Sequence, residues 1–337
     1  MNKDEIGVNK NESAPSWTRR SNWKMPLTES NETCVAGFGS AFPARALITF
    51  QALGLGCHEL AFDSPHGRRS VSRCFGGSFK GERLAGLIAE DVSNEWRLYA
   101  GAGDDQFSVE GLITLLADGG ETILMKYIGR GGGRYGAGSY RIGAVFEAPV
   151  ASPLAWLNSV SAAGYVEIDG DSLRADLFEL LGQASDDATA VEVEPLYQMT
   201  GLDSVGDRLT IHGAVSNRYF TMAETGCLAE GALEGMWVKG LSWGPHRMSS
   251  SASSLPWQID MKVMMQTKQG VPVLQQYLGT IPDRTAPGIA PNDPSWRTAA
   301  VFETDVNSEQ SWLNEVVAVG VGWKEDNEAH YHYYILV

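Results

Sequence analysis

Alternation of apolar and polar residues runs through most of the chain and predicts β-strands, because successive side chains of a strand point to opposite faces. The clearest case is 259–265, where isoleucine, methionine and valine occupy every second position. The turn Lys268-Gln269-Gly270 leads from it into a second apolar run, Val271–Leu278. The same hairpin is expected over 111–128, turning at Asp118-Gly119-Gly120, since glycine readily adopts the positive φ of tight turns. The pattern therefore predicts antiparallel β-structure.

A repeated block indicates that this pattern occurs twice. Ala144-Val145-Phe146-Glu147 is followed by Trp156-Leu157-Asn158, and Ala300-Val301-Phe302-Glu303 is followed by Trp312-Leu313-Asn314. Both parts of the block are displaced by 156 residues. Identical blocks at identical internal spacing indicate a tandem duplication.

The duplication divides the chain into parts that are each long enough to bury a core of their own. We expect a polar N-terminal tail over 1–44, a first β-barrel repeat over 45–182, an acidic linker over 183–194 and a second β-barrel repeat over 195–337.

One segment, 172–181, carries conflicting signals. Its leucines recur at helical spacing behind Ser172, which favours a capped helix. The duplication instead places Asp176–Leu180 over His332–Leu336, whose composition is typical of a strand, so we predict strands in both repeats. The two Trp-Leu-Asn blocks are predicted to be short helices. Because closure of a sheet removes its exposed edges, the expected fold class is all-β, with two tandem antiparallel β-barrels and few short helices.

Composition and charge narrow the range of partners. The formal net charge of −15 disfavours nucleic acid and anionic membranes, since both require clustered Lys and Arg. No apolar run approaches the ~18 residues of a membrane span, and residues 1–32 lack the pattern of a secretory signal. Four scattered cysteines are typical of reduced thiols, so a cytoplasmic location is expected. Neither a cofactor nor a metal is predicted, and a homodimer is left open.

Several motifs together resemble a known family. Gly76-Gly77-Ser78-Phe79-Lys80-Gly81, the hairpin after it and the Phe-x(9)-Trp-Leu-Asn pattern of both repeats are similar to the domain of unknown function 3237 family. The resemblance covers about 46–182 and 195–337. It implies small antiparallel barrels similar to allene-oxide-cyclase-like barrels, several of which bind hydrophobic small molecules. Some barrels of that general kind are cofactor-free cyclases or pericyclases.

The chain departs from this family at one element, which usually reads Gly-Gly-x-Asp-Trp. The first repeat has Ser93-Asn94-Glu95-Trp96, which keeps an acid before the tryptophan. The second has Trp243-Gly244-Pro245-His246, which places no acid there. A site built on the usual acid is therefore expected only in the first repeat.

Residues that differ between the repeats are the candidates for chemistry, because a working site needs to exist only once. In the second repeat, we expect His246 to exchange a proton near neutral pH and Arg247 to hold a carbonyl or enolate oxygen, with a surface-loop histidine beside a solvated arginine as the alternative. Glu95 and Arg97 are their catalytic counterparts in the first repeat. Aromatic residues expected to bind substrate are Trp243, Tyr277, Trp96, Tyr127 and Trp257.

Other motifs have a structural as well as a functional interpretation. Glu147 and Glu303 are acid–base candidates if they face a barrel interior, and solvated surface residues otherwise. His330-x-His332 has the spacing of a metal pair but lacks a recognisable third ligand, so packing against the barrel wall is the alternative. Gly129–Arg134 is either an anion cradle or a flexible hairpin loop at a barrel mouth, where it acts as a lid.

These expectations converge on a hydrophobic, oxygenated small molecule as the partner. The first hypothesis is a cofactor-independent cyclase, isomerase or pericyclase that confines a natural-product intermediate in a β-barrel pocket. A non-catalytic binding or dirigent-like protein is the first alternative. A hydrolase or hydratase with a Glu or His base is the second.

Overall fold

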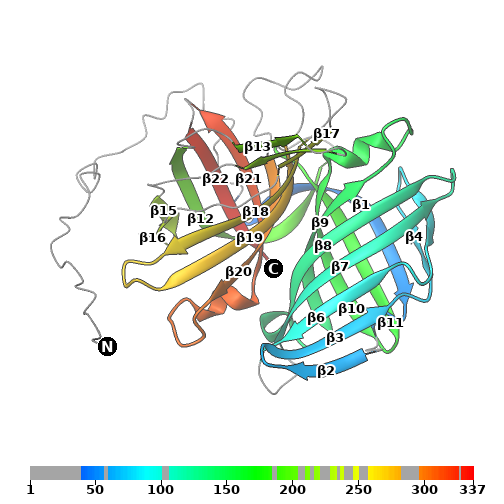
Figure 1. Ribbon diagram of the computed structural model, residues 1–337, viewed down its shortest axis with the longest axis horizontal. Helices are drawn as coiled ribbons and strands as arrows, with labels where there is room; N and C mark the ends of the chain where they lie inside the picture. Colours follow the sequence, from blue (N-terminus) through cyan, green and yellow to red (C-terminus); the bar gives the residue numbers. More distant parts are fainter. Residues whose placement is uncertain are drawn as a thin grey trace, which may run out of the picture. The chain divides into compact units, whose positions relative to one another are not determined.

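The computed structural model describes residues 39–56, 60–100, 106–183, 188–203, 209–212, 216–220, 228–233, 236–238, 246–249, 257–281, 296–325 and 328–337. Within these ranges the chain forms β-strands and short 3-10 helices, with no α-helix (Figure 1). None of the described helices has the length and apolar character needed to cross a membrane.

Eight antiparallel strands close the first barrel, in the spatial order β1-β4-β5-β7-β8-β9-β10-β11 and back to β1. They are β1 (Ala41–Leu53), β4 (Gly77–Lys80), β5 (Ala85–Ile88), β7 (Gln106–Ala117), β8 (Thr122–Gly132), β9 (Ser139–Glu147), β10 (Ser161–Asp169) and β11 (Ser172–Leu180). A flanking ladder is attached to β7 in the order β6 (Asn94–Tyr99), β3 (Gly67–Arg73) and β2 (Leu60–Ser64).

The second barrel repeats this arrangement strand for strand, in the order β12-β15-β16-β18-β19-β20-β21-β22 and back to β12. The ring consists of β12 (Thr189–Asp203), β15 (Leu228–Gly231), β16 (Met236–Val238), β18 (Trp257–Gln266), β19 (Pro272–Ile281), β20 (Trp296–Thr304), β21 (Val317–Glu325) and β22 (Glu328–Leu336). Its flanking strands are β17 (His246–Ser249), β14 (Ser216–Phe220) and β13 (Leu209–His212). The expected all-β fold of two tandem antiparallel barrels is confirmed.

Two local predictions are also confirmed. Residues 172–180 form strand β11, so the pairing partners on both sides override the helical spacing of the leucines. The Trp-Leu-Asn blocks form the short 3-10 helices η3 (Ala155–Ser159) and η4 (Ser311–Glu315). In each, the asparagine accepts a backbone hydrogen bond, Asn158 Oδ1 from Ala148 N and Asn314 Oδ1 from Thr304 N, both at 2.8 Å.

The structure differs from the sequence expectations in three segments. Strand β1 begins at Ala41, inside the expected tail, whose residues 1–38 lie outside the described residues. The expected linker is strand from Thr189 onward, because 189–192 pair with β1. Gly129–Arg134 is not a lid loop. It continues β8 to Gly132 and enters the 3-10 helix η2 (Gly133–Tyr135), paired with β7 and β9.

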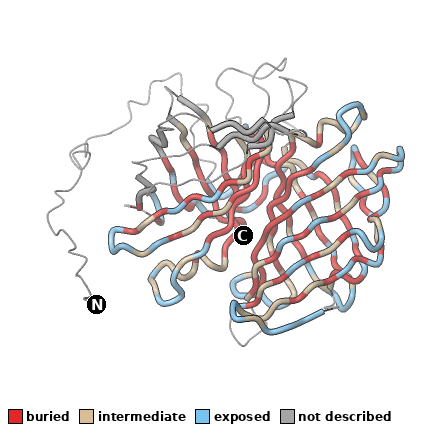
Figure 2. The backbone as a smooth tube through the Cα atoms, in the orientation of Figure 1, coloured by how far each residue is buried: buried red, intermediate tan, exposed pale blue. Residues whose placement is uncertain are grey.

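Apolar side chains fill the interior of each barrel and the contact between the barrels. Along the strands, buried residues alternate with more exposed ones (Figure 2). One cluster lies inside the first barrel and a second inside the second barrel. Two further clusters join residues of both barrels, one around Phe42 and Tyr334 and one around Val145 and Val301. Burial of this apolar surface is the main force that holds the barrels against each other.

The packing between the barrels pairs equivalent positions of the duplication. Gly143 lies against Ala299, and a Cβ added to Gly143 would fall 2.0 Å from the Cβ of Ala299. Ile128 and Leu278, and likewise Val145 and Val301, share one apolar cluster. The backbone of β12 adds to this packing by pairing with β1 of the first barrel as well as with β22 of the second. The interface therefore resembles that of a symmetric dimer.

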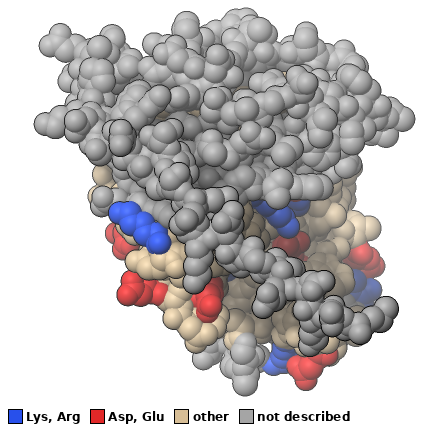
Figure 3. Space-filling model, turned by 60° about the vertical axis from the view of Figure 1, so that its left-hand side comes forward, with Lys and Arg blue, Asp and Glu red and all other residues tan. Residues whose placement is uncertain are grey.

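The surface carries charges of both signs. On the face drawn in Figure 3, acidic and basic side chains of the described residues are interspersed. An example between the barrels is the ion pair of Lys126 Nζ with Asp260 Oδ2, 2.9 Å apart and well exposed.

Candidate functional site in the first barrel

A charged cluster lies inside the first barrel, on strand β6. Alternation along β6 turns Glu95, Arg97 and Tyr99 inward, and all three are buried. Trp96 points to the opposite face and is 47% exposed. A buried charge is costly unless it is paired and hydrogen-bonded, so the partners of Glu95 decide what the cluster can do.

Three side chains converge on the carboxylate of Glu95, which has no exposed surface. The hydroxyls of Tyr127 and Tyr140 both donate to Oε2, at 2.5 and 2.6 Å. Arg97 Nε donates to Oε1 at 2.6 Å, and Arg97 Nη2 also donates to the carbonyl oxygen of Leu55 at 3.1 Å. Hydrogen bonds to an ionised acceptor are short and about twice as strong as neutral ones, so this network holds all four side chains in place.

Glycines on the barrel wall make room for the aromatic rings. Gly111 pairs with both Glu95 and Tyr127, and a Cβ on Gly111 would lie 2.0 Å from Cζ of Tyr127. Gly131 plays the same part for Phe107, whose Cζ would lie 2.2 Å from an added Cβ. Gly131, one of the glycines that suggested a flexible loop in the sequence, is therefore a place where a ring lies against the backbone.

Burial controls the protonation of the cluster. It raises the pKa of Tyr127 and of Tyr140 well above the usual value for a phenol, and the neighbouring Glu95 raises both further. Burial is the largest single effect on the pKa of Arg97 and would lower it, but Glu95, Tyr140 and Tyr99 together outweigh burial and the net pKa is raised. The guanidinium also lies over the rings of Phe107 and Tyr140, at 5.0 and 5.5 Å. The phenols therefore remain proton donors and Arg97 remains a cation.

One polar atom beside the cluster is left without a partner. Ser70 on β3 pairs directly with Arg97, is fully buried, and its Oγ makes no hydrogen bond. An unsatisfied buried hydroxyl costs on the order of 1–3 kcal/mol, so its presence calls for an explanation. A ligand oxygen beside Arg97 would satisfy it.

Of the residues that the sequence singled out, the structure brings Glu95, Arg97 and Tyr127 together. It does not bring Trp96 to them, because Trp96 lies on the outer face of β6. The sequence reasoning missed Tyr140 and Ser70. Inward alternation from Tyr140 to Ile142 along β9 was the available signal for the former, whereas a serine carries no comparable signal.

The second barrel has a different interior. Tyr277 is buried, with its hydroxyl 3.3 Å from that of Tyr331, and Trp257 is half-buried at the start of β18. Only the strand placement of His246 and Arg247 is described, on β17, while Trp243 lies outside the described residues. The roles expected for these three residues stay predictions.

The remaining motifs take structural positions. Glu147 and Glu303 are exposed, with Phe146 and Phe302 buried on the opposite face, so the solvated interpretation holds. Buried Arg130 donates to the carbonyl oxygen of Phe302 at 2.8 Å, which ties the glycine-rich segment to the other barrel.

The two histidines at the end of the chain pack around one tryptophan. The ring of His330 stacks on Trp323 at 5.3 Å, and that of His332 meets the same indole edge-on at 5.0 Å. This agrees with the packing interpretation of the His-x-His motif.

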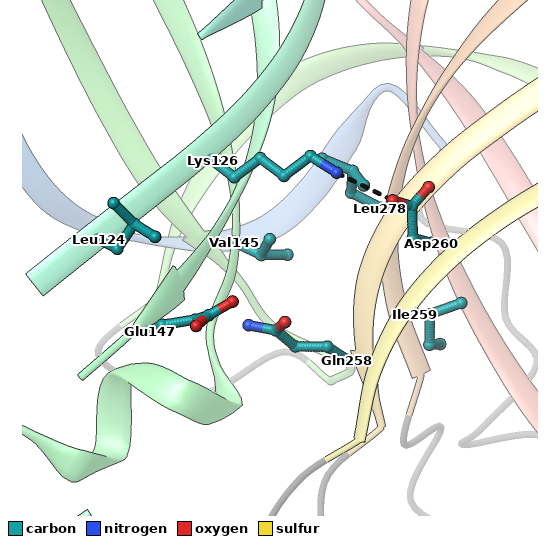
Figure 4. Close-up of a pocket in the computed structure, with 8 residues that line it drawn as sticks. All are labelled: Leu124, Lys126, Val145, Glu147, Gln258, Ile259, Asp260 and Leu278. Atoms are coloured by element: carbon teal, nitrogen blue, oxygen red, sulfur yellow. Dashed lines mark hydrogen bonds and ion pairs between the residues drawn. The ribbon is translucent and has the colours of Figure 1, made fainter. Parts of the chain in front are cut away.

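A small cavity lies between the barrels rather than inside the charged cluster. Its volume is about 60 Å³, and Figure 4 shows the Lys126–Asp260 ion pair across it, with Glu147 and Gln258 below. It is far smaller than the ~300 Å³ or more of a typical small-molecule pocket. We therefore place the candidate site at Glu95 and not here.

Comparison with known proteins gives matches to solved structures alone. No protein-family model matches the chain, and neither does any curated protein. A β-barrel-like protein of Acinetobacter baumannii is 21% identical over 41% of this chain and 94% of its own, with a TM-score of 0.35. A conserved protein of unknown function from Rhodopseudomonas palustris is 17% identical over 42% and 98%, with a TM-score of 0.35. An enzyme from Penicillium herquei is 16% identical over 42% and 99%, with a TM-score of 0.31. What the site can do is therefore inferred from its own residues.

Proposed function

We propose that the first barrel is a cofactor-independent cyclase or isomerase for a hydrophobic, oxygenated small molecule, with Glu95 as proton acceptor. The observation that carries the proposal is the convergence of two phenols and a guanidinium on one fully buried carboxylate. A positioned carboxylate beside two neutral phenol donors and a cation is an arrangement that general acid–base catalysis can use. The unsatisfied hydroxyl of Ser70 supplies a vacant hydrogen-bonding position next to it.

The reaction divides between the carboxylate and the phenols. A substrate carbonyl that takes over the hydrogen bonds of Tyr127 and Tyr140 frees Oε2 of Glu95 to accept a proton. That proton leaves the carbon next to the carbonyl, and the electron pair of the broken C–H bond moves onto the carbonyl oxygen, giving an enolate. The two phenols stabilise the enolate oxygen, while Arg97 stays beside Glu95 and compensates its charge. Return of the proton to another carbon completes an isomerisation. In a cyclisation, the enolate carbon attacks a second carbonyl carbon of the same substrate, the electron pair of that C=O bond moves onto its oxygen, and this oxygen takes the proton back from Glu95.

Proton exchange at carbon tests this proposal without knowledge of the natural substrate. In D2O, the protein should accelerate deuterium incorporation next to the carbonyl of 2-tetralone and 2-indanone, followed by NMR. Glu95→Gln should slow the catalysed exchange by about 100-fold or more, which is the usual contribution of a general base. Glu147→Gln, on an exposed strand position, is the matched control and should exchange at the wild-type rate.

The outcomes separate the proposal from its alternatives. Equal exchange in wild type and Glu95→Gln would refute it. If Glu95→Gln does not fold, Tyr140→Phe keeps the carboxylate and should slow exchange by losing one oxyanion donor. Saturable binding of the ketones without exchange would favour the non-catalytic binding or dirigent-like protein. Addition of water to an activated alkene or ester without carbon exchange would favour the hydratase or hydrolase.

The proposal extends to the family, the cellular location and the partners of the protein. We propose that each repeat belongs to the domain of unknown function 3237 type, which the eight-stranded barrels support. A cytoplasmic location, a hydrophobic small-molecule partner and the open question of a homodimer remain predictions from the sequence.

A further inference from the structure

The second barrel encloses a cluster of phenols where the first barrel has aliphatic side chains. Tyr197, Tyr331 and Tyr333 are buried at the positions that Ile48, Ala175 and Leu177 occupy in the first barrel, at the same offsets of 149 and 156 residues as the motifs. Strand pairing supports this equivalence, because Ile48 pairs with Leu177 and Tyr197 pairs with Tyr333.

The rings form a continuous aromatic surface. Tyr331 and Tyr333 are stacked, with centroids 5.8 Å apart and planes at 16°. Tyr197 lies 5.0 Å from Tyr333, and Tyr277 lies 6.0 Å from Tyr331. Trp296 continues the surface, 5.4 Å from Tyr331, at the position that Tyr140 occupies in the first barrel. Flat aromatic groups are therefore the shape that this interior fits.

The polar atoms of this interior are neutral, and donors are left over. Gln275 is fully buried, and its Oε1 accepts from the Tyr197 hydroxyl at 2.8 Å. Its Nε2 has no hydrogen bond of good geometry. Burial raises the pKa of Tyr333 well above the usual value for a phenol, and the nearby Gln275 lowers it by a smaller amount. The buried Nε1 of Trp296 has no partner. Among the described residues that line this interior, none is charged.

Glycines on β21 let these rings pack against the wall of the barrel. Gly322 pairs with both Trp296 and Tyr331, and a Cβ there would lie 2.8 Å from the Tyr331 ring and 2.9 Å from the Trp296 ring. Gly320 does the same for Tyr333, at 2.7 Å. The rings therefore lie close against the wall of the barrel, with the indole N–H left to bind something other than protein.

We propose that the second barrel is a separate binding site for a neutral, planar molecule that carries a hydrogen-bond acceptor. The ligand stacks on the tyrosine surface, and its carbonyl or ether oxygen accepts from Nε1 of Trp296. The site is independent of the function proposed for Glu95.

Isothermal titration calorimetry with two matched probes tests the proposal. Coumarin is neutral, planar and carries acceptor oxygens, whereas naphthalene has a similar shape and no acceptor. The full chain should bind coumarin more tightly than naphthalene. Trp296→Phe keeps a ring and removes the N–H, so coumarin should bind about five- to ten-fold more weakly, as expected for one hydrogen bond, while naphthalene binding is unchanged.

Two controls test whether coumarin binds at Trp296. Trp312→Phe changes another partly buried tryptophan that packs against the same core and should leave coumarin binding as it is. Trp156→Phe changes the counterpart of Trp312 in the first barrel and should also have no effect.

Three results would overturn the proposal: no saturable coumarin binding, equal weakening of both probes by Trp296→Phe, or coumarin binding that Trp296→Phe leaves unchanged. If Trp296→Phe does not fold, the indole N–H signals of 15N-tryptophan-labelled wild type decide. Coumarin should shift one indole signal downfield, while naphthalene should leave all N–H signals without a hydrogen-bond shift.

Discussion

The pairing of Glu95 with Arg97 predicts a large and reversible loss of stability. Glu95→Gln keeps the shape of the side chain but leaves the guanidinium of Arg97, whose side chain is 3% exposed, without an ionised partner. At an effective dielectric constant of about 20, two unit charges ~4 Å apart attract by about 4 kcal/mol. Removal of one member of a buried pair typically costs about 3–5 kcal/mol, and we expect Glu95→Gln to lower the free energy of unfolding by that amount.

A second substitution tests the cause of this loss. Glu95→Gln combined with Arg97→Met removes both charges, so the double variant should recover to within about 2 kcal/mol of wild type. Asp260→Asn breaks the exposed Lys126–Asp260 pair, whose side chains are 45% and 36% exposed, and should cost less than about 1 kcal/mol. Urea unfolding followed by circular dichroism gives the three values.

If Glu95→Gln lowers the free energy of unfolding no more than Asp260→Asn does, the buried ion pair is not a major source of stability. The same follows if the double variant is as unstable as the single one, since the loss would then come from packing and not from an unpaired charge.

Three further outcomes follow from the same structure. Gly111→Ala should destabilise the protein by about 1–3 kcal/mol and displace the Tyr127 ring, which near-ultraviolet circular dichroism detects, because the added Cβ overlaps that ring. Above pH 10 the unfolded chain loses phenol protons that Tyr127 and Tyr140 retain, so the free energy of unfolding should fall with rising pH by up to about 1.4 kcal/mol per unit for each phenol. The double Tyr→Phe variant should show a shallower fall between pH 10 and 11, and an unchanged slope would contradict the burial effect. Burial and the nearby His330 lower the pKa of His332 to about 4. The stability that this neutral imidazole contributes is present above pH 6.5 and should be lost between pH 6.5 and 4, by about 3 kcal/mol, in wild type but not in His332→Gln, as measured by unfolding at each pH.

The fold followed from the sequence because its two signals, alternation and duplication, are both local or internal to the chain. Strand β11 is the clearest case, since comparison with the second repeat corrected a helical pattern that local propensity favoured. Gly129–Arg134 was misjudged for the opposite reason. A glycine can mark a turn or a ring lying against the backbone, and only the neighbouring strands distinguish the two.

The site could be predicted only as far as alternation reaches. Glu95, Arg97 and Tyr127 lie on regular strands, so their types and spacing indicated a shared face. Tyr140 joins them from β9, which is reached from β6 across β7 and β8, and it lies 45 residues away from Glu95 along the chain. Ser70 was invisible because its significance is a missing hydrogen bond, which is a property of packing and not of residue type.

The matched contacts between the barrels have a consequence for how the two copies could diverge. Two separate but identical subunits must carry the same residue on both sides of a twofold axis, whatever that residue is. Joining the copies in one polypeptide, in which β12 pairs with both β1 and β22, removes that restriction. Gly143 can then face Ala299, where a second alanine in place of the glycine would collide with its twin. The same freedom allows the first barrel to enclose an ion pair while the described residues of the second enclose a cluster of tyrosines.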